Sequence, residues 1–149
     1  MASQGCLFAQ TGKPSDAVRM LTSGITEYRS TGATLWAPFH LSNLATSYAS
    51  LGQLKDAWRC VGETMTAVAT TKEKWFEAEV HRIAGDIALL SPEPAAAKAE
   101  AYFERALTVA RKQQAKSWEL RAAMSMARLW RDQGKVQRAR ELLAPVYGW

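Results

Sequence analysis

The sequence of 149 residues contains few of the features that would support disulfide bonding, membrane insertion or secretion. Its two cysteines, Cys6 and Cys60, cannot form a disulfide framework, and free cysteines usually pack inside helices. No apolar run reaches the roughly 18 residues of a membrane-spanning helix. The N-terminus also lacks the charged and then apolar pattern of a signal peptide. We therefore expect a cytoplasmic protein without a membrane segment.

The motifs of common enzymes are also missing. The dipeptide Gly12-Lys13 lacks the upstream glycine of a phosphate-binding loop. His40 and His81 are the only histidines, and neither has a second ligand at metal-binding spacing. Carboxylates such as Glu79 and Asp86 are expected on helix surfaces, where nothing would raise their pKa values for acid–base catalysis. The sequence thus predicts no catalytic residue, no metal and no cofactor.

What the sequence does contain is one pattern repeated along the chain. Gly52 follows a Leu-Ala-x-x-Tyr segment and precedes an alanine by five positions. Gly134 stands in a similar segment two periods of about 41 residues later, and a looser copy places Gly12 one such period before Gly52. A fixed period of this size is typical of stacked helical pairs.

Other markers follow the same register. The small residues Ala45, Ala84 and Ala127 recur at intervals of about 40 residues, and the tryptophans Trp36, Trp75 and Trp118 keep the same two intervals. The expected third glycine is replaced by serine at position 91, followed by a Pro-Glu-Pro insertion. Helix start and stop signals then predict eight helices. Their approximate ranges are 2–11, 14–30, 36–51, 54–71, 75–90, 95–114, 118–133 and 136 to a bend or end near 145.

The repeated positions resemble those of the tetratricopeptide repeat (TPR). Leu44-Ala45-x-x-Tyr48 matches the first half of that pattern, and Ala99-x-x-x-Phe103-x-x-Ala106 matches the second half. The usual period is about 34 residues, so a longer period implies longer helices. HEAT and armadillo repeats share the longer period but lack the alanine, tyrosine and turn glycine. The resemblance implies an all-α, right-handed superhelical solenoid of antiparallel helix pairs, with about 3.5 repeats of about 41 residues.

The predicted repeats divide the chain into a partial repeat at 1–34 and three more at 35–74, 75–116 and 117–149, all within one domain. Residues 75–149 show a narrower resemblance, carried by the runs AKSWELRAA, ARLWRDQGK and LLAPVYGW. They resemble the repeat region of bacterial signalling proteins that also carry a nucleotide cyclase or DNA-binding domain and a STAND-type ATPase domain. This resemblance implies a fragment or a short relative of a longer chain.

Positive charge is concentrated toward the C-terminus. Residues 98–149 contain eleven Lys and Arg against five Asp and Glu, whereas residues 1–97 contain eight against nine. This asymmetry favours an acidic partner, although long basic side chains can also simply solvate exposed helix faces. Nucleic acid is a less favoured partner, because no recognition module is present and the tryptophans are expected to pack inside the repeats.

The register also predicts which residues line an inner groove. In such repeats the first helix of each pair faces inward, and Arg121, Arg128 and Arg131 share one helix face. Guanidinium groups bind carboxylates through paired hydrogen bonds, although Asp132 would neutralise part of this cluster. The predicted partner-binding residues are Phe39, Ser42, Thr46, His81, Arg121, Met124, Arg128 and Arg131.

Two functions remain open at this point. The favoured one is a non-catalytic interaction module of a bacterial signalling or regulatory protein, which binds a protein or peptide in the groove or packs on a parent ATPase domain. The alternative is a small-effector-sensing solenoid of a transcription or cyclase regulator, which would need an enclosed pocket with aromatic walls. The apolar C-terminal end further predicts self-association or poor order there. Its apolar residues are Leu142, Leu143, Val146, Tyr147 and Trp149.

Overall fold

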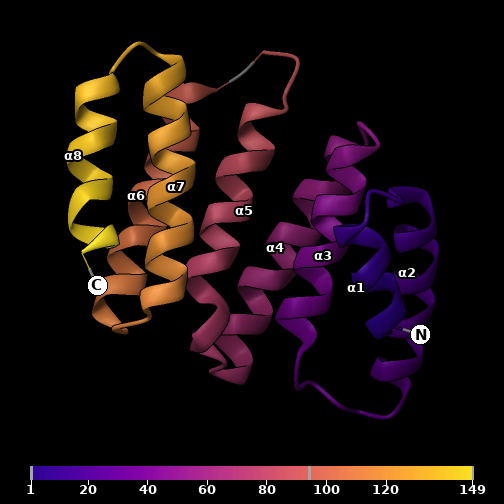
Figure 1. The fold of residues 1–149 in the computed structure, drawn as a ribbon. Helices are drawn as coiled ribbons and strands as arrows, with labels where there is room; N and C mark the ends of the chain where they lie inside the picture. Colours follow the sequence, from indigo (N-terminus) through magenta and orange to yellow (C-terminus); the bar gives the residue numbers. More distant parts are fainter. Residues whose placement is uncertain (1, 94, 149) are drawn as a thin grey trace. The chain divides into compact units, whose positions relative to one another are not determined.

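A computed structural model describes residues 2–93 and 95–148, and all regular structure within them is helical (Figure 1). At most helix ends, the predicted boundary lies within two residues of the observed one. The helix α8 continues through Pro145. The α-helices of the described residues are α1 (Ala2–Gln10), α2 (Pro14–Ser30), α3 (Ala37–Ser50), α4 (Leu54–Thr71), α5 (Glu77–Leu89), α6 (Ala96–Lys112), α7 (Lys116–Asp132) and α8 (Val136–Tyr147), and a 3₁₀ turn, η1 (Lys74–Phe76), precedes α5.

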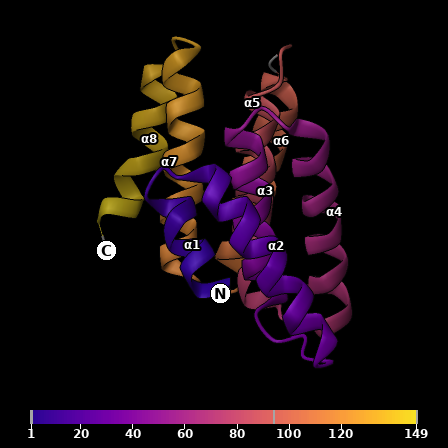
Figure 2. The same ribbon diagram turned by 90° about the vertical axis from the view of Figure 1, so that its right-hand side faces the viewer.

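Each helix packs most extensively against one neighbour in the chain, so that α1 pairs with α2, α3 with α4, α5 with α6, and α7 with α8. The chain folds into two compact units, residues 1–76 and residues 77–149. In the first unit α3 also packs on α1 and α2, and in the second α7 also packs on α5 and α6. Figure 2 shows α7 and α8 side by side from a second direction. The expected helix-pair repeats are therefore present, and the single domain over all four repeats stays a prediction.

The turns inside the helix pairs are built as the sequence predicts. Gly52 and Gly134 adopt φ angles of 74° and 76°, the left-handed conformation that glycine accepts without a steric penalty. The amide after each glycine donates to a carbonyl five positions back, from Gln53 to Tyr48 at 2.9 Å and from Lys135 to Trp130 at 2.7 Å. This bond pattern ends a helix and satisfies its last carbonyls.

A second set of left-handed residues ends the second helix in the first three pairs. These residues are Gly32, Lys72 and Gln114, with φ angles of 74°, 59° and 53°. They recur at intervals of about 40 residues, as the repeats do, although only one of them is glycine. A search of the sequence for turn glycines does not find this set, because position in the repeat rather than residue type defines it.

The predicted small residues lie where the helices of a pair cross. Ala45, Ala84 and Ala127 are buried, and so are Ala57 and Ala99 on the second helices. An even closer approach occurs between α5 and α6, where a Cβ on Gly85 would lie 2.4 Å from Cε1 of the buried Phe103. Real Cβ contacts essentially never reach this distance, so a larger residue at position 85 would force the ring of Phe103 or the helices to shift.

The tryptophans do not all pack inside the repeats, and this corrects the sequence-based expectation. Trp36 and Trp75 are 48 % and 41 % exposed, and their rings meet edge to face at 5.2 Å between centroids. Trp130, in contrast, is buried, and its Nε1–H donates to Oε1 of Glu100 at 2.9 Å. Among the described residues no helix combines the length and the apolar composition that a bilayer crossing requires.

Candidate partner-binding site

A cavity of about 240 Å³ lies between α7 and α8 in the second unit. We call it the α7–α8 cavity. Its floor is apolar, since it includes the buried alanines Ala127 and Ala139. Three arginines, Arg128, Arg131 and Arg140, also line it, and all three are exposed. The cavity therefore combines an apolar floor with cationic groups that water can reach.

The cavity exists because this hairpin packs differently from the one before it. By the repeat register, Arg128 takes the position that Gly85 holds one repeat earlier, and Leu143 takes that of Phe103. In the α5–α6 hairpin the ring of Phe103 fills the space that Gly85 leaves open. In the α7–α8 hairpin both equivalent residues line a hollow instead.

Apolar side chains of α8 extend the cavity toward solvent. Val136 and Tyr147 are 43 % and 68 % exposed, and Leu143 is half-buried. Large apolar groups that remain exposed around a depression are typical of binding surfaces when they are contiguous. In the sequence, Leu143 and Tyr147 stand out only as part of an apolar C-terminal end. The spacing of 136, 139, 140, 143 and 147 along one helix is the signal that could have identified this face.

The arginines of the α7–α8 cavity differ in their ionic partners. Arg131 binds Asp132 at 3.0 Å, as expected from the sequence for part of the cluster. Within the described part of the chain, no carboxylate lies within salt-bridge distance of Arg128 or Arg140. These two guanidinium groups thus have no direct ion pair there, although the charge of Arg128 acts on Asp86.

Arg121 does not belong to this cavity, because it takes part in an internal ionic bridge. Its Nη2 lies 2.7 Å from Oε1 of Glu79, a buried residue that also accepts hydrogen bonds from Nε and Nη2 of Arg82 at 2.8 and 2.7 Å. Burial by itself raises the pKa of Glu79, but the hydrogen bonds from Arg82 and Arg121 outweigh it and hold this pKa below its usual range.

The structure corrects the expectation that the carboxylates of α5 lie on the helix surface, where nothing would raise their pKa values. Glu79 is buried, and partial burial raises the pKa of Asp86 against the opposing charges of Arg82 and Arg128. The physical reason is that the charged face of α5 packs toward α7, where opposite charges compensate one another.

The predicted residues of the first unit lie on α3. Thr46 is exposed, and its hydroxyl donates to the carbonyl of Ser42 at 3.0 Å. Ser42 itself is buried, and its Oγ has no hydrogen-bond partner among the described residues. Phe39 is half-buried and contacts Trp36 and Phe76 edge to face at centroid distances of 6.1 and 5.6 Å.

His81 lies at the α5–α6 contact rather than on an open surface. It is buried, stacks on Tyr102 of α6 with 6.5 Å between ring centroids, and its Nδ1 has no partner among the described residues. Burial lowers the pKa of His81. Three of the eight predicted residues, Met124, Arg128 and Arg131, thus meet in one cavity.

The potential metal ligands in the described part of the chain do not cluster. No three His, Cys, Asp or Glu side chains in it are placed to share a metal ion. Cys6 and Cys60 are buried, and burial raises the pKa of each thiol to about 11, so that neither is a thiolate nucleophile at neutral pH.

Comparisons with known proteins agree with the helix-pair architecture. No protein-family model and no curated protein matches the sequence. Among solved structures, the fold is similar to a Podosopora anserina protein described as a kinesin light chain with nearly identical TPR-like repeats, with a TM-score of 0.71 and 18 % identity over 97 % of this chain and 71 % of that one. A variant of the same protein gives the same TM-score and identity, and covers 97 % and 70 %. The fold is therefore that of TPR-like repeats.

Proposed function

We propose that this protein is a protein–protein interaction module that binds an acidic, amphipathic segment of a partner at the α7–α8 cavity. The TPR-like fold supports a role in protein interaction. The observation that carries the proposal is the pairing of an apolar hollow with Arg128 and Arg140, which have no carboxylate within salt-bridge distance among the described residues. Both features of an amphipathic acidic segment are thus matched.

Binding would use each part of the cavity for one purpose. An apolar side chain of the partner would enter the hollow above Ala127 and Ala139, where it displaces water from apolar surface. Carboxylates one helical turn away would accept paired hydrogen bonds from Arg128 and Arg140, since a guanidinium presents several N–H groups in one plane. A helix with apolar and acidic residues at such spacing satisfies both requirements.

The same charges argue against a second copy of this chain as the occupant. In a symmetric dimer the same patch lies on both sides of the interface, so that Arg128 and Arg140 would face the same arginines. Like charges held together in an interface are strongly unfavourable. An acidic partner of a different sequence therefore has better support than self-association through this end.

The wider context of the module is also a proposal. The resemblance of residues 75–149 to bacterial multidomain regulators supports a non-catalytic, cytoplasmic role in signalling, in which the occupant is a separate protein or a surface of a parent ATPase domain. In both cases the recognised surface would be acidic and amphipathic.

A peptide of defined sequence tests the proposal directly. The probe is a fluorescein-labelled helical peptide with Leu at every fourth position and Glu one position after each Leu, and its twin has Lys in place of Glu. Fluorescence anisotropy should show saturable binding of the Glu peptide and weaker binding of the Lys peptide. The double variant Arg128→Glu, Arg140→Glu should lower the affinity for the Glu peptide by at least about tenfold, because two charge-assisted contacts become repulsive.

A charge-matched variant serves as the control. Arg105→Glu with Lys112→Glu changes the net charge of the same unit equally, at exposed positions of α6 outside the cavity. It should leave the affinity within about threefold of wild type at physiological salt. An equal loss in both double variants would mean nonspecific charge attraction, and no binding by the wild type would contradict the proposal.

A further inference from the structure

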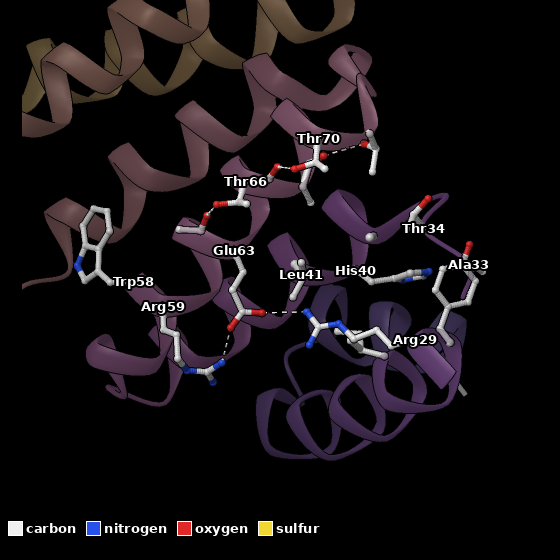
Figure 3. A pocket seen from close by; sticks show the side chains of 16 residues that line it. Arg29, Ala33, Thr34, His40, Leu41, Trp58, Arg59, Glu63, Thr66 and Thr70 are labelled. Atoms are coloured by element: carbon white, nitrogen blue, oxygen red, sulfur yellow. Dashed lines mark hydrogen bonds and ion pairs between the residues drawn. The ribbon is translucent and has the colours of Figure 1, made fainter. Parts of the chain in front are cut away.

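A second and larger cavity, of about 620 Å³, lies in the first unit among α2, α3 and α4 (Figure 3). We call it the α2–α4 cavity. Ile25 of α2, together with Ala37 and Leu41 of α3, gives it apolar walls. Its volume falls within the range of roughly 300–1,000 Å³ that small-molecule sites occupy. The proposed partner site at α7–α8 does not use it.

Part of the α4 wall presents small or already satisfied side chains to the cavity. Gly62 lies inside this helix, and a Cβ built there would meet nothing within 4 Å. Farther along α4, the hydroxyls of Thr66 and Thr70 donate to the carbonyls of Gly62 and Thr66 at 3.0 and 2.6 Å (Figure 3). Their donors are therefore occupied, and this wall offers few free hydrogen-bonding groups.

Aromatic residues and a fixed loop complete the walls. Tyr28, His40 and Trp58 all line the cavity. The hydroxyl of Tyr28 donates to the carbonyl of Leu35 and so holds the α2–α3 loop, which contributes Ala33 to the lining. Aromatic groups and small residues such as Gly62 and Ala67 in one lining favour a flat or ring-containing ligand over an extended polypeptide.

The charged groups of the cavity are paired with one another. Glu63 accepts hydrogen bonds from Nη2 of Arg29 at 2.9 Å and from Nη1 of Arg59 at 2.8 Å, and Figure 3 shows its carboxylate between the two guanidinium groups. Although burial raises the pKa of Glu63, these two arginines lower it overall, so the carboxylate is ionised at neutral pH. Arg59 also pairs with Asp56 at 3.5 Å, so two carboxylates balance the two guanidinium groups, and an uncharged ligand would leave these pairs intact.

His40 provides one polar group whose state the surroundings define. Its Nδ1 lies 3.5 Å from Sγ of Cys6, and burial raises the pKa of this thiol to about 11, which keeps the thiol protonated. Burial also lowers the pKa of His40, so the ring is neutral at pH 7. A thiol that donates to Nδ1 leaves the ring proton on Nε2, the second polar atom of this lining residue.

We propose that the α2–α4 cavity binds an uncharged, mainly apolar, ring-containing small molecule. The proposal rests on the volume, the apolar and aromatic lining, the internally paired charges and the open space above Gly62. It concerns a different site and a different class of ligand from the peptide proposed for α7–α8.

The test uses N-phenyl-1-naphthylamine, a neutral dye that fluoresces in apolar surroundings, titrated into the full 149-residue chain. The wild type should show a saturable increase in fluorescence at one dye per chain. The sulfonated analogue 1-anilinonaphthalene-8-sulfonate should bind at least about tenfold more weakly, because its charge has no free partner in the cavity. Absence of saturable binding of the neutral dye, or equal binding of both dyes, would overturn the proposal.

Filling the cavity gives the decisive comparison. Gly62→Phe places a ring in the open space above α4 and should lower the affinity for the neutral dye by at least about tenfold. Ala69→Phe adds the same ring to the same helix at an exposed position outside the cavity and should leave the affinity within about twofold. Thr66→Leu is a second filling variant, so that a folding defect in one variant cannot account for both losses.

Two further results separate this site from the rest of the chain. Wild-type affinity for the dye in Gly62→Phe and Thr66→Leu, with helical content unchanged by circular dichroism, would mean that the dye binds elsewhere, and the proposal would be wrong. The Arg128→Glu, Arg140→Glu variant should bind the dye as the wild type does. The two proposed sites can therefore succeed or fail independently.

Discussion

The two units each contain a glutamate held between two arginines, but they differ in how far water reaches it. In the first unit Glu63 lies between Arg29 of α2 and Arg59 of α4, and its side chain is 34 % exposed. In the second unit Glu79 lies between Arg82 of α5 and Arg121 of α7, and its side chain is 5 % exposed. One glutamate and two arginines therefore form a surface bridge in the first unit and an internal bridge in the second.

The glycines inside the helices show a similar difference between an open and a closed environment. Gly62 in the first unit faces open space, whereas Gly85 in the second faces the ring of Phe103. The first unit thus contains a large open cavity beside an exposed bridge, whereas in the second unit the α5–α6 pair is closed at Gly85 and the bridge between α5 and α7 is buried. Burial, rather than residue type, determines what each charge or glycine contributes to the stability of its unit.

The largest expected effect is at the buried bridge. Glu79→Gln should lower the free energy of unfolding by about 3 kcal/mol, because it leaves Arg82, whose side chain is only 13 % exposed, without its main counter-charge. Urea denaturation followed by circular dichroism measures this loss. A loss below about 1 kcal/mol would mean that the bridge behaves like a surface pair, and the comparison would fail.

The pH dependence of stability should reveal the buried bridge of the second unit. The pKa of Glu79 is lowered by folding, so its contribution is present above the unfolded pKa of about 4.3 and is lost as the pH falls through the folded value. Wild type should therefore lose more stability than Glu79→Gln between neutral pH and pH about 3. Parallel curves for the two proteins would contradict the assigned pKa direction.

The glycine in the closed pair should not tolerate a methyl group. Gly85→Ala should cost about 2 kcal/mol, since its Cβ would overlap the ring of Phe103 at the α5–α6 contact. Thermal unfolding of the variant and of Gly85→Ala combined with Phe103→Leu provides the check. The smaller side chain should restore part of the loss, and an unchanged melting temperature in the single variant would show that the pair is looser than described.

The glycine in the open unit should respond with the opposite sign. Gly62→Ala should stabilise the chain by about 0.5 to 1 kcal/mol, because alanine favours a helix interior and its Cβ meets no neighbour. Denaturant unfolding measured beside Gly85→Ala gives a direct test. If both substitutions destabilise the protein, the space beside Gly62 is not free.

The smallest effect is expected at the exposed bridge. Glu63→Gln should change the free energy of unfolding by about 0.5 kcal/mol, because solvent screens the pairs with Arg29 and Arg59. This small change should shrink further in 1 M salt, whereas the cost of Glu79→Gln should persist. A salt-insensitive loss as large as that at Glu79 would remove the distinction between the units.

Most of the fold could be predicted from the sequence because it repeats. Turn glycines such as Gly52 and Gly134, and small residues such as Ala45 and Ala84, recur at a fixed period and locate both the turns and the crossings. Left-handed residues such as Lys72 follow the same period without being glycine. They could have been found by counting from Gly32.

The candidate site was only partly predictable, and the reason is geometric. Helical spacing places His81 on a face of α5, but it does not tell whether that face meets solvent or α6. Arg121 and Arg128 share one face of α7, yet one binds Glu79 and the other lines the α7–α8 cavity. Gly62 and Gly85 are alike in sequence and differ only in what surrounds them.

The most direct test of the proposed function is a ¹H–¹⁵N correlation spectrum of the labelled protein during titration with the acidic amphipathic peptide. The account predicts shifts in α7 and α8, with Met124, Arg128 and Leu143 among the largest and α3 unchanged. Shifts centred on Thr46 or other exposed positions of α3, with α7 and α8 unaffected, would contradict it.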